Sequence, residues 1–144
     1  MSAVAEGTMY PCLFYNDAPA AIDWLKRVFG FRELMVVPGE GGTIAHSELA
    51  IGGGVIMVGS ANRPGRDQTS RVSPRDLPGV NQSCYVLLSD VRAHFEHAKS
   101  EGAEITIEYN EPDYGGAGYS ANDLEGHTWS FGSYAPDLNA GSPK

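Results

Sequence analysis

The sequence predicts an α+β fold built from two copies of a unit in which one strand and one helix precede three further strands. The length of 144 residues suits one hydrophobic core. A hydrophobic content of 42% is too high for a disordered chain. The 18 glycines and 9 prolines supply the many turns that short strands need, which favours strands over a helix bundle.

The first unit opens with a strand-like run that leads into a helix. Asp17 is a natural N-cap, Pro19 suits the first helical turn, and Gly30 suits the end of the helix. Apolar residues recur between these signals at helical spacing, which predicts one buried helix face. These apolar positions are Ile22, Leu25, Val28 and Phe29.

The second unit repeats the same order of signals. Asp90 stands at the N-cap position and Gly102 at the end of a helix whose apolar series is Val91, Phe95 and Ala98. Each unit then continues with three strand-like runs. These runs cover residues 31–37, 42–51 and 54–60 in the first unit and residues 103–109, 116–123 and 127–134 in the second.

The two units share one sequence offset. Asp17 and Asp90 lie 73 residues apart, and so do Gly53 and Gly126, which open the last strands. Matching element order with a matching offset is typical of internal duplication. Between the units lies a polar, proline-containing stretch without periodicity, which we interpret as a linker or mobile loop. We expect one domain over residues 1–144, divided into module one (8–59), a linker (60–80), module two (81–135) and a tail (136–144).

Charge and composition exclude several classes of partner. The net charge of -8 argues against a nucleic-acid partner. Residues 101–125 hold seven acids and no Lys or Arg, which indicates either a solvated face or attraction of a cation. The chain shows no run of ~20 apolar residues and no signal-like start, so we expect neither membrane insertion nor export. Cys12 and Cys84 lack disulfide or metal spacing and fit free thiols in a reducing cytoplasm.

Three stretches resemble a known family. They are PCLFYNDAPAAIDWLKRVFGF, HSELAIGGGVIMVG and YGGAGYSANDLEGHTWSFGSY. Together they resemble the vicinal oxygen chelate superfamily of glyoxalase, bleomycin-resistance and dioxygenase proteins, over about Met9 to Tyr134. The stretch DLEGHTWSF is similar to a pattern of the bacterial glyoxalase-like subgroup, with Leu124 where that pattern has Pro. Members of the superfamily catalyse different reactions or only bind antibiotics, so the reaction has to be argued from the site.

The resemblance implies an incomplete, curved mixed β-barrel with helices outside and a ligand cleft on the concave side. Strand alternation then places Leu13, Ile56, Val58, Val86, Trp129 and Phe131 toward the helices. His46 and Glu48 point to the cleft, and the offset of 73 makes Tyr119 and Ala121 their counterparts. The other residues that alternation assigns to the cleft as ligand-binding candidates are Tyr10, Cys12, Phe14, Met57, Ser83, Tyr85 and Ser130.

The resemblance also implies where a metal ion would be held. Metal-dependent relatives place His or Glu at positions that correspond to Tyr10, Met57, Ser83 (or Cys84) and Ser130. A Met and a Ser do not hold a hard divalent ion. We therefore expect no metal ligand among these residues and no cofactor, although a divalent ion at a different place stays open.

His46 and Glu48 are the candidate catalytic residues. They lie two apart on one strand and hence on one face, where they could form an acid/base pair. They could also belong to a displaced metal site, or only hydrogen-bond to their neighbours. His127 has a predicted structural role beside the glycine turn, and His94 and His97 lie on the second helix outside the cleft.

Two functions follow from these residues. The first is a metal-independent protein that sequesters an antibiotic or another aromatic or cationic compound, with Tyr114 and Tyr119 supplying aromatic faces. The second is a lyase, isomerase or other enzyme that uses His46 and Glu48. The resemblance further implies a homodimer. The arginines of the linker could instead recognise an anion.

Overall fold

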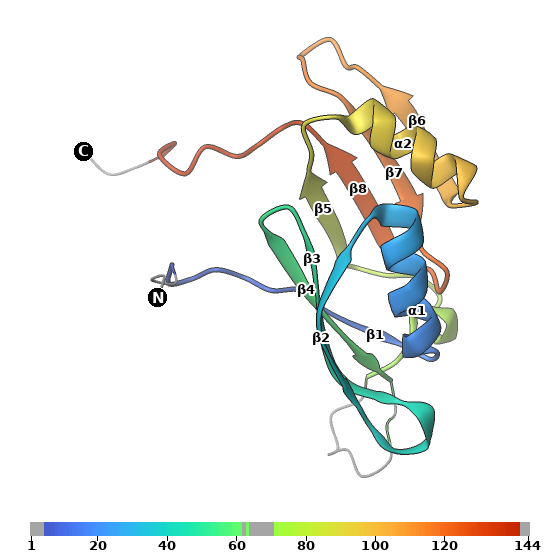
Figure 1. Ribbon diagram of the computed structural model, residues 1–144. Helices are drawn as coiled ribbons and strands as arrows, with labels where there is room; N and C mark the ends of the chain where they lie inside the picture. Colours follow the sequence, from blue (N-terminus) through green and yellow to red (C-terminus); the bar gives the residue numbers. More distant parts are fainter. Residues whose placement is uncertain (1–4, 62, 64–70, 142–144) are drawn as a thin grey trace.

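The computed structural model describes residues 5–61, 63 and 71–141 and contains two four-stranded mixed sheets (Figure 1). The strand orders are β1-β4-β3-β2 and β5-β8-β7-β6, so the two units have the same topology. The elements are β1 (Cys12–Tyr15), α1 (Ala18–Trp24), η1 (Leu25–Phe29), β2 (Arg32–Pro38), η2 (Glu40–Gly42), β3 (Ile44–Ile51), β4 (Gly54–Ser60), η3 (Pro74–Asp76), β5 (Ser83–Leu87), α2 (Val91–Ser100), β6 (Glu104–Asn110), β7 (Gly118–Asn122) and β8 (Thr128–Gly132).

This architecture confirms the predicted α+β fold of two βαβββ modules. Each long helix lies beside the sheet of its own module (Figure 1). Over the described residues the two sheets stay separate, as in a curved barrel that does not close. No helix in the described part of the chain is long and apolar enough to span a membrane.

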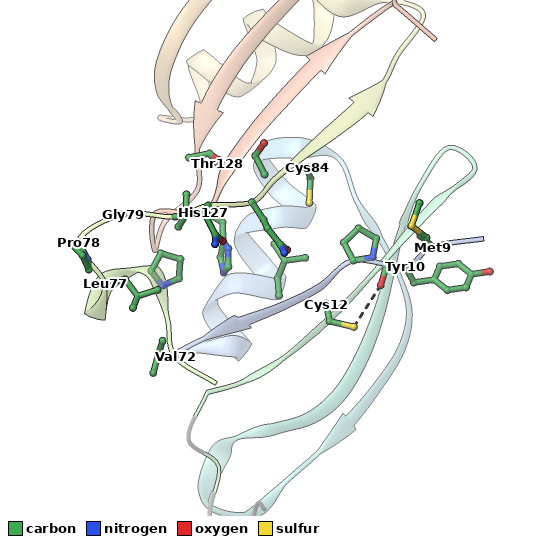
Figure 2. Close-up of a pocket in the computed structure, with 17 residues that line it drawn as sticks. Met9, Tyr10, Cys12, Val72, Leu77, Pro78, Gly79, Cys84, His127 and Thr128 are labelled. Carbon is green, nitrogen blue, oxygen red and sulfur yellow. Dashed lines mark hydrogen bonds between the residues drawn. The ribbon is translucent and has the colours of Figure 1, made fainter. Parts of the chain in front are cut away.

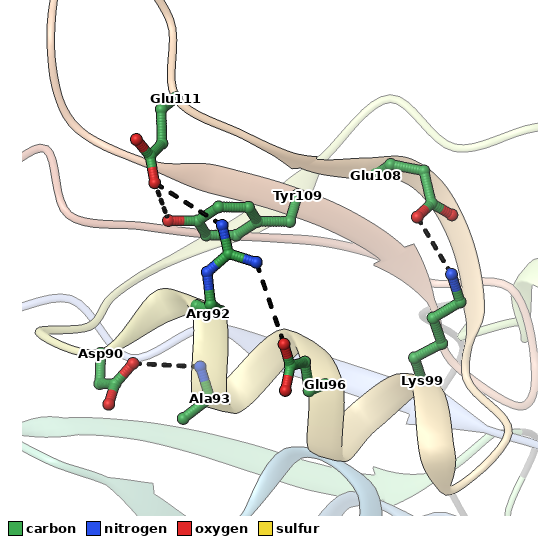
Figure 3. A network of polar contacts seen from close by, with 8 residues as sticks. All are labelled: Asp90, Arg92, Ala93, Glu96, Lys99, Glu108, Tyr109 and Glu111. Atoms are coloured by element: carbon green, nitrogen blue, oxygen red, sulfur yellow. Dashed lines mark hydrogen bonds and ion pairs between the residues drawn. The ribbon is translucent and has the colours of Figure 1, made fainter.

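The helix boundaries follow the predicted signals. The Asp17 carboxylate accepts a hydrogen bond from Ala20 N at 3.1 Å, and Asp90 accepts one from Ala93 N at 3.0 Å (Figure 3). These bonds satisfy N–H groups that have no partner in the first helical turn. The π-helical turn η1 continues α1 and ends at Gly30, whose φ of 84° is the left-handed conformation that glycine adopts at low cost.

The core lies between the helices and the sheets of both modules. Leu13, Ile56 and Val58 from the first sheet are buried, as strand alternation predicts. Trp129 and Phe131 of β8 are also buried, and Val86 packs against them from β5. Phe29 contacts Phe131 with a centroid distance of 4.8 Å, so η1 packs against the second sheet and joins the two modules.

Two histidines on α2 also join the modules. His94 Nε2 lies 2.7 Å from Phe29 O and His97 Nε2 lies 2.8 Å from Arg27 O. Carbonyl groups in the last turn of a helix have no N–H donor within the helix. Here the imidazole N–H groups of α2 donate to two of these carbonyls. The Arg27 guanidinium forms an ion pair with the Glu101 carboxylate at 2.9 Å. His94 and His97 therefore lie outside the concave faces, as predicted, and hold α2 to η1.

The two modules differ by one residue in the loop before their last strand. Met57 and Ser130 differ by 73, but their partners across the ladder, Glu48 and Ser120, differ by only 72. A register change of one residue moves every side chain of a strand to the other face. Tyr119 is consequently 2% exposed, in the core beneath α2, so the prediction that Tyr119 and Ala121 face the cleft is wrong.

Candidate functional site

A cavity of about 1090 Å³ lies between the two modules (Figure 2). The segment around Met9 and Tyr10 forms one side, and Leu77 and Pro78 lie on the other. The start of β5 and the beginning of β8 complete the lining. The remaining lining residues are Pro11, Cys12, Leu13, Val72, Pro74, Gly79, Val80, Asn81, Gln82, Ser83, Cys84, His127 and Thr128.

Among the described residues that line this cavity, none is Asp, Glu, Lys or Arg. Apolar side chains come from the segment before β1 and from the residues after η3, whereas amide and hydroxyl groups come from Asn81, Gln82, Ser83 and Thr128. An apolar surface with a few polar groups is the usual character of a small-molecule site.

The segment after the first module is fixed to the second module by Glu125. This carboxylate is 3% exposed and accepts hydrogen bonds from Asn16 N at 2.7 Å and Asp17 N at 2.8 Å. The Ser73 hydroxyl donates to it at 2.5 Å, and Ser73 is itself fully buried. Bonds to an ionised acceptor are strong, so Glu125 holds the start of η3 where the cavity lining begins.

A second buried carboxylate organises the loop before β8. Asp123 Oδ2 accepts hydrogen bonds from Tyr15 Oη at 2.6 Å and from Trp129 Nε1 at 3.0 Å. Its Oδ1 accepts from the backbone N–H groups of residues 125–127. Burial, followed by the nearby Asp123 charge, raises the pKa of Tyr15 well above its ordinary value. Asp123 and Glu125 of the DLEGH stretch therefore act as buried hydrogen-bond acceptors that hold the structure together.

Part of the stretch between the modules makes contacts with both of them. Arg75 donates to Leu124 O at 2.9 Å, and Asn16 Nδ2 donates to Asp76 at 3.1 Å. Residues 71–80 are thus anchored to both modules, through Asn16 of the first and Leu124 of the second, and supply part of the cavity lining. Residues 62 and 64–70, including Arg66, lie outside the described part of the chain.

A smaller cavity of about 400 Å³ lies next to the first. It shares Met9, Pro11 and Cys84 with the larger cavity and reaches toward the turn between β3 and β4. Burial, together with Asp123, raises the pKa of the Cys84 thiol to about 11. Cys84 is therefore protonated near neutral pH and adds a weakly polar group to both cavities.

Four of the predicted ligand-binding residues line these cavities. Tyr10, Cys12 and Ser83 line the larger one. Tyr85 lines the smaller one, and its hydroxyl donates to Tyr134 O at 2.7 Å. The structure therefore brings together residues from the first strand of each module, although they lie at the contact between modules rather than inside one curved sheet.

The other predicted residues lie apart from these cavities within the described part of the chain. Phe14 pairs with Gly59 on β4 and carries the Arg71 guanidinium 5.1 Å above its ring. Met57 lies beside Cys12 and Glu48. Ser130 hydrogen-bonds to Ser120 at 2.8 Å. Tyr114 is 90% exposed in the loop before β7.

His46 and Glu48 are in direct contact on β3. His46 Nε2 lies 2.7 Å from Glu48 Oε2, and both side chains are partly exposed. Their strand partners on β2 are Val37 and Met35. The pair lies where strand alternation predicts, on the same face of the first sheet as Met57 and Cys12. Cys12 lines the larger cavity, whereas His46 and Glu48 do not.

The residues at the family's metal-ligand positions do not fit a divalent ion. Tyr10 and Ser83 line the larger cavity, whereas Met57 and Ser130 belong to two separate sheets. Ser130 is already paired with Ser120. Among the described residues, no group of three or more His, Cys, Asp or Glu side chains is arranged to hold an ion. A thioether and neutral hydroxyls are poor ligands for hard cations.

The acidic stretch is largely engaged with the protein itself. Figure 3 shows Glu108 paired with Lys99 at 3.1 Å, and Glu111 accepting a hydrogen bond from Tyr109 at 2.7 Å. Arg92 lies 4.3 Å from the centroid of the Tyr109 ring. Further along the stretch, Asp123 and Glu125 are buried acceptors, as described above. The acidic residues of this stretch therefore form contacts on the surface or accept hydrogen bonds in the interior.

Sequence analysis does not predict several contributors to the cavity. It assigns His127 only a structural role, yet His127 also lines the cavity, and it interprets the stretch that contains Leu77 as a linker. The sequence does contain a signal for Leu77, because Val72, Leu77 and Val80 are apolar residues spaced through an otherwise polar segment. Apolar residues in a polar loop indicate that the loop packs against something.

Comparison with known proteins identifies the family. The model of the Glyoxalase/Bleomycin resistance protein/Dioxygenase superfamily matches residues 8–131. The chain belongs to this superfamily, as the sequence resemblance predicted.

Similar proteins were found among curated sequences and solved structures. The uncharacterized protein Rv0887c of Mycobacterium tuberculosis is 29% identical over 139 residues, covering 96% of this chain and 81% of that protein. TioX from Micromonospora sp. ML1 is 34% identical with a TM-score of 0.67, covering 89% of this chain and 100% of TioX. The fosfomycin resistance protein FosX from Listeria monocytogenes is 12% identical with a TM-score of 0.62, covering 92% of this chain and 94% of FosX. The FosX likeness concerns the fold alone.

Proposed function

We propose that the protein binds and sequesters an uncharged, aromatic small molecule in the cavity between its modules, without a metal ion. The observation that carries this proposal is the cavity itself, with its volume of about 1090 Å³ and a mainly apolar lining in which no described residue is Asp, Glu, Lys or Arg. Sites for drug-sized molecules commonly enclose about 300–1,000 Å³. A cavity of this size accommodates a compound of several fused or linked rings.

The lining narrows the choice between an aromatic and a cationic ligand. The net charge of -8 attracts cations at long range. Inside the cavity, however, the described lining residues offer no carboxylate to compensate a buried positive charge. Burying an unpaired charge is costly, so this cavity favours an uncharged ring system.

A titration with matched variants tests the binding site. Leu77 of the cavity lining is 44% exposed, and Leu34 on β2, away from the lining, is 45% exposed. We expect Leu77→Lys to weaken binding of an uncharged aromatic probe such as Nile red at least about ten-fold, because it places a charge in the apolar lining. Leu34→Lys should change the affinity less than about two-fold.

The same titration separates the alternatives. Binding should persist after dialysis against a chelator, and a requirement for added metal would contradict metal independence. Selective binding of cationic aromatic dyes would contradict an uncharged ligand. Equal weakening by Leu77→Lys and Leu34→Lys would contradict the placement of the site. A saturating ligand should also raise Tm in proportion to ln(1 + [L]/Kd).

A second candidate function is catalysis at the His46–Glu48 pair. The observation that favours it is the 2.7 Å contact between these partly exposed side chains. A carboxylate that fixes the orientation of an imidazole is a common arrangement for proton transfer. If the protein is a lyase or isomerase, His46→Gln and Glu48→Gln should each abolish turnover while the affinity for the cavity probe stays unchanged.

We also propose that the protein acts as a cytoplasmic homodimer. Exposed apolar side chains on β2, including Met35 at 46% and Val37 at 42%, leave surface available for a second copy. Light scattering after size-exclusion chromatography would measure the mass. A mass of one chain at micromolar concentration would contradict this proposal.

A further inference from the structure

His127 lies on the cavity wall in a fixed orientation. Its Nε2 is 3.0 Å from Phe14 O, and its backbone N–H donates to Asp123 Oδ1 at 3.1 Å. Its ring contacts the ring of Tyr15, with centroids 4.7 Å apart. Tyr15 is fully buried and is itself held by Asp123. Figure 2 shows His127 among the residues that line the cavity.

These contacts determine which ring nitrogen of His127 carries the proton. A carbonyl oxygen only accepts hydrogen bonds, so Nε2 must be the donor to Phe14 O. In a neutral imidazole the other nitrogen is then an acceptor. Within the described residues Nδ1 has no hydrogen-bond partner, and it does not belong to the buried side-chain atoms that lack one. It is therefore an acceptor left open to solvent or to a ligand.

The rest of the lining makes this acceptor distinctive. The hydroxyls of Ser83 and Thr128 rotate and both donate and accept, and the amides of Asn81 and Gln82 also present both roles. No carboxylate is present among the described lining residues. His127 Nδ1 is thus an acceptor-only group whose position is fixed by the surrounding structure, which makes it suited to recognition of a donor.

We propose that His127 selects the ligand of the cavity by accepting a hydrogen bond at Nδ1 from a ring-bound O–H or N–H group. The ligand class is then an uncharged aromatic compound that bears a hydrogen-bond donor, such as a phenol or a ring N–H. This inference rests on the proposed binding function and adds to it the chemistry by which the site discriminates among aromatic compounds.

Two probes that share a naphthalene ring test the donor requirement. The probes are 2-naphthol and 2-methoxynaphthalene, which differ in the donor. Naphthalene fluorescence measures the dissociation constant of each probe in the wild type and in the His127 variants. The quantity compared is the ratio of the two dissociation constants. Because the extra methyl group has the same effect in every variant, the change of this ratio isolates the hydrogen bond. We expect the preference for 2-naphthol to fall about five-fold when the acceptor is lost.

The variants separate recognition from structure. In His127→Gln the side-chain amide N–H takes the place of Nε2–H toward Phe14 O, but nothing replaces Nδ1. This variant should keep its Tm and its affinity for 2-methoxynaphthalene within about two-fold, and should lose the preference. In His127→Asn the amide oxygen takes the place of Nδ1, so the preference should be retained even though the bond to Phe14 O is lost.

The outcomes distinguish this inference from the function on which it rests. Binding of both probes with a ratio that His127→Gln leaves unchanged would overturn the role of His127 and leave the binding function standing. Binding of neither probe would overturn both. Nitrogen-15 NMR gives an independent reading: a proton on Nδ1 instead of Nε2 in the free protein would also overturn the inference.

Discussion

Replacing Glu125 by glutamine perturbs the contact that anchors the segment lining the cavity. The carboxylate accepts three hydrogen bonds, from Asn16 N at 2.7 Å, Asp17 N at 2.8 Å and Ser73 Oγ at 2.5 Å. Glutamine keeps one of the two oxygens. In either orientation its NH₂ group therefore faces a backbone N–H that has lost its acceptor.

The expected cost is about 3 kcal/mol. A hydrogen bond to a charged group contributes about 1.5–3 kcal/mol, and a buried donor left without a partner costs about 1–3 kcal/mol. Glutamine is neutral, so the variant no longer carries the free-energy cost of burying a charge. This gain offsets part of the loss from weakening the other two hydrogen bonds. For a chain of this length the change corresponds to a fall in Tm of about 10 °C.

Urea denaturation of Glu125→Gln and the wild type measures this change directly, provided that both unfold in one transition. The matched control is Glu108→Gln, because Glu108 pairs with Lys99 at 3.1 Å and its side chain is 65% exposed. Exposed pairs contribute about 0–1 kcal/mol. A loss below about 1 kcal/mol in Glu125→Gln, or an equal loss in the control, would show that the buried hydrogen bonds of Glu125 do not stabilise the fold.

Two further predictions concern titratable groups. Burial lowers the pKa of His94, so the unfolded chain takes up its proton at a higher pH than the folded protein does. The free energy of unfolding should therefore decrease as pH falls below about 6.5, and urea denaturation from pH 7.5 to 5 should show a shallower decrease for His94→Gln; an identical slope would contradict this. Because the pKa of Cys84 is about 11, alkylation by iodoacetamide at pH 8 should modify exposed Cys12 first, as mass spectrometry of the intact and digested protein would show. Equal rates at the two cysteines would contradict the effect of burial.

Local signals predicted the fold well because short-range physical chemistry determines them. Asp17 and Asp90 cap their helices through their own neighbours, and Gly30 ends a helix because its backbone is left-handed. Alternation placed Trp129 and Phe131 correctly because both lie on one strand. Where a prediction depended on carrying a position from one module to the other, as for Tyr119, a one-residue difference was enough to reverse it.

The candidate site was harder to predict because its parts meet only in the folded chain. Tyr10, Cys12 and Ser83 were found through their strands, and they do line the cavity. Leu77 was not found, since it lies in a segment whose position depends on the bond between Ser73 and Glu125, 52 residues apart. No periodicity in a sequence encodes such a contact.

The same one-residue difference that misplaced Tyr119 also distinguishes the loops that precede the last strand of each module. In the first module Ile51 pairs with Gly54 across a tight turn, whereas in the second the loop runs from Asp123 to His127, where Asp123 N bonds to His127 O. The longer loop has room for Glu125, which binds the first module and the linker, and it ends at His127 on the cavity wall. The tight glycine turn of the first module offers no equivalent side chain. The two modules therefore share one sheet topology, and the longer loop of the second module contributes Glu125 and His127, on which our binding proposal depends.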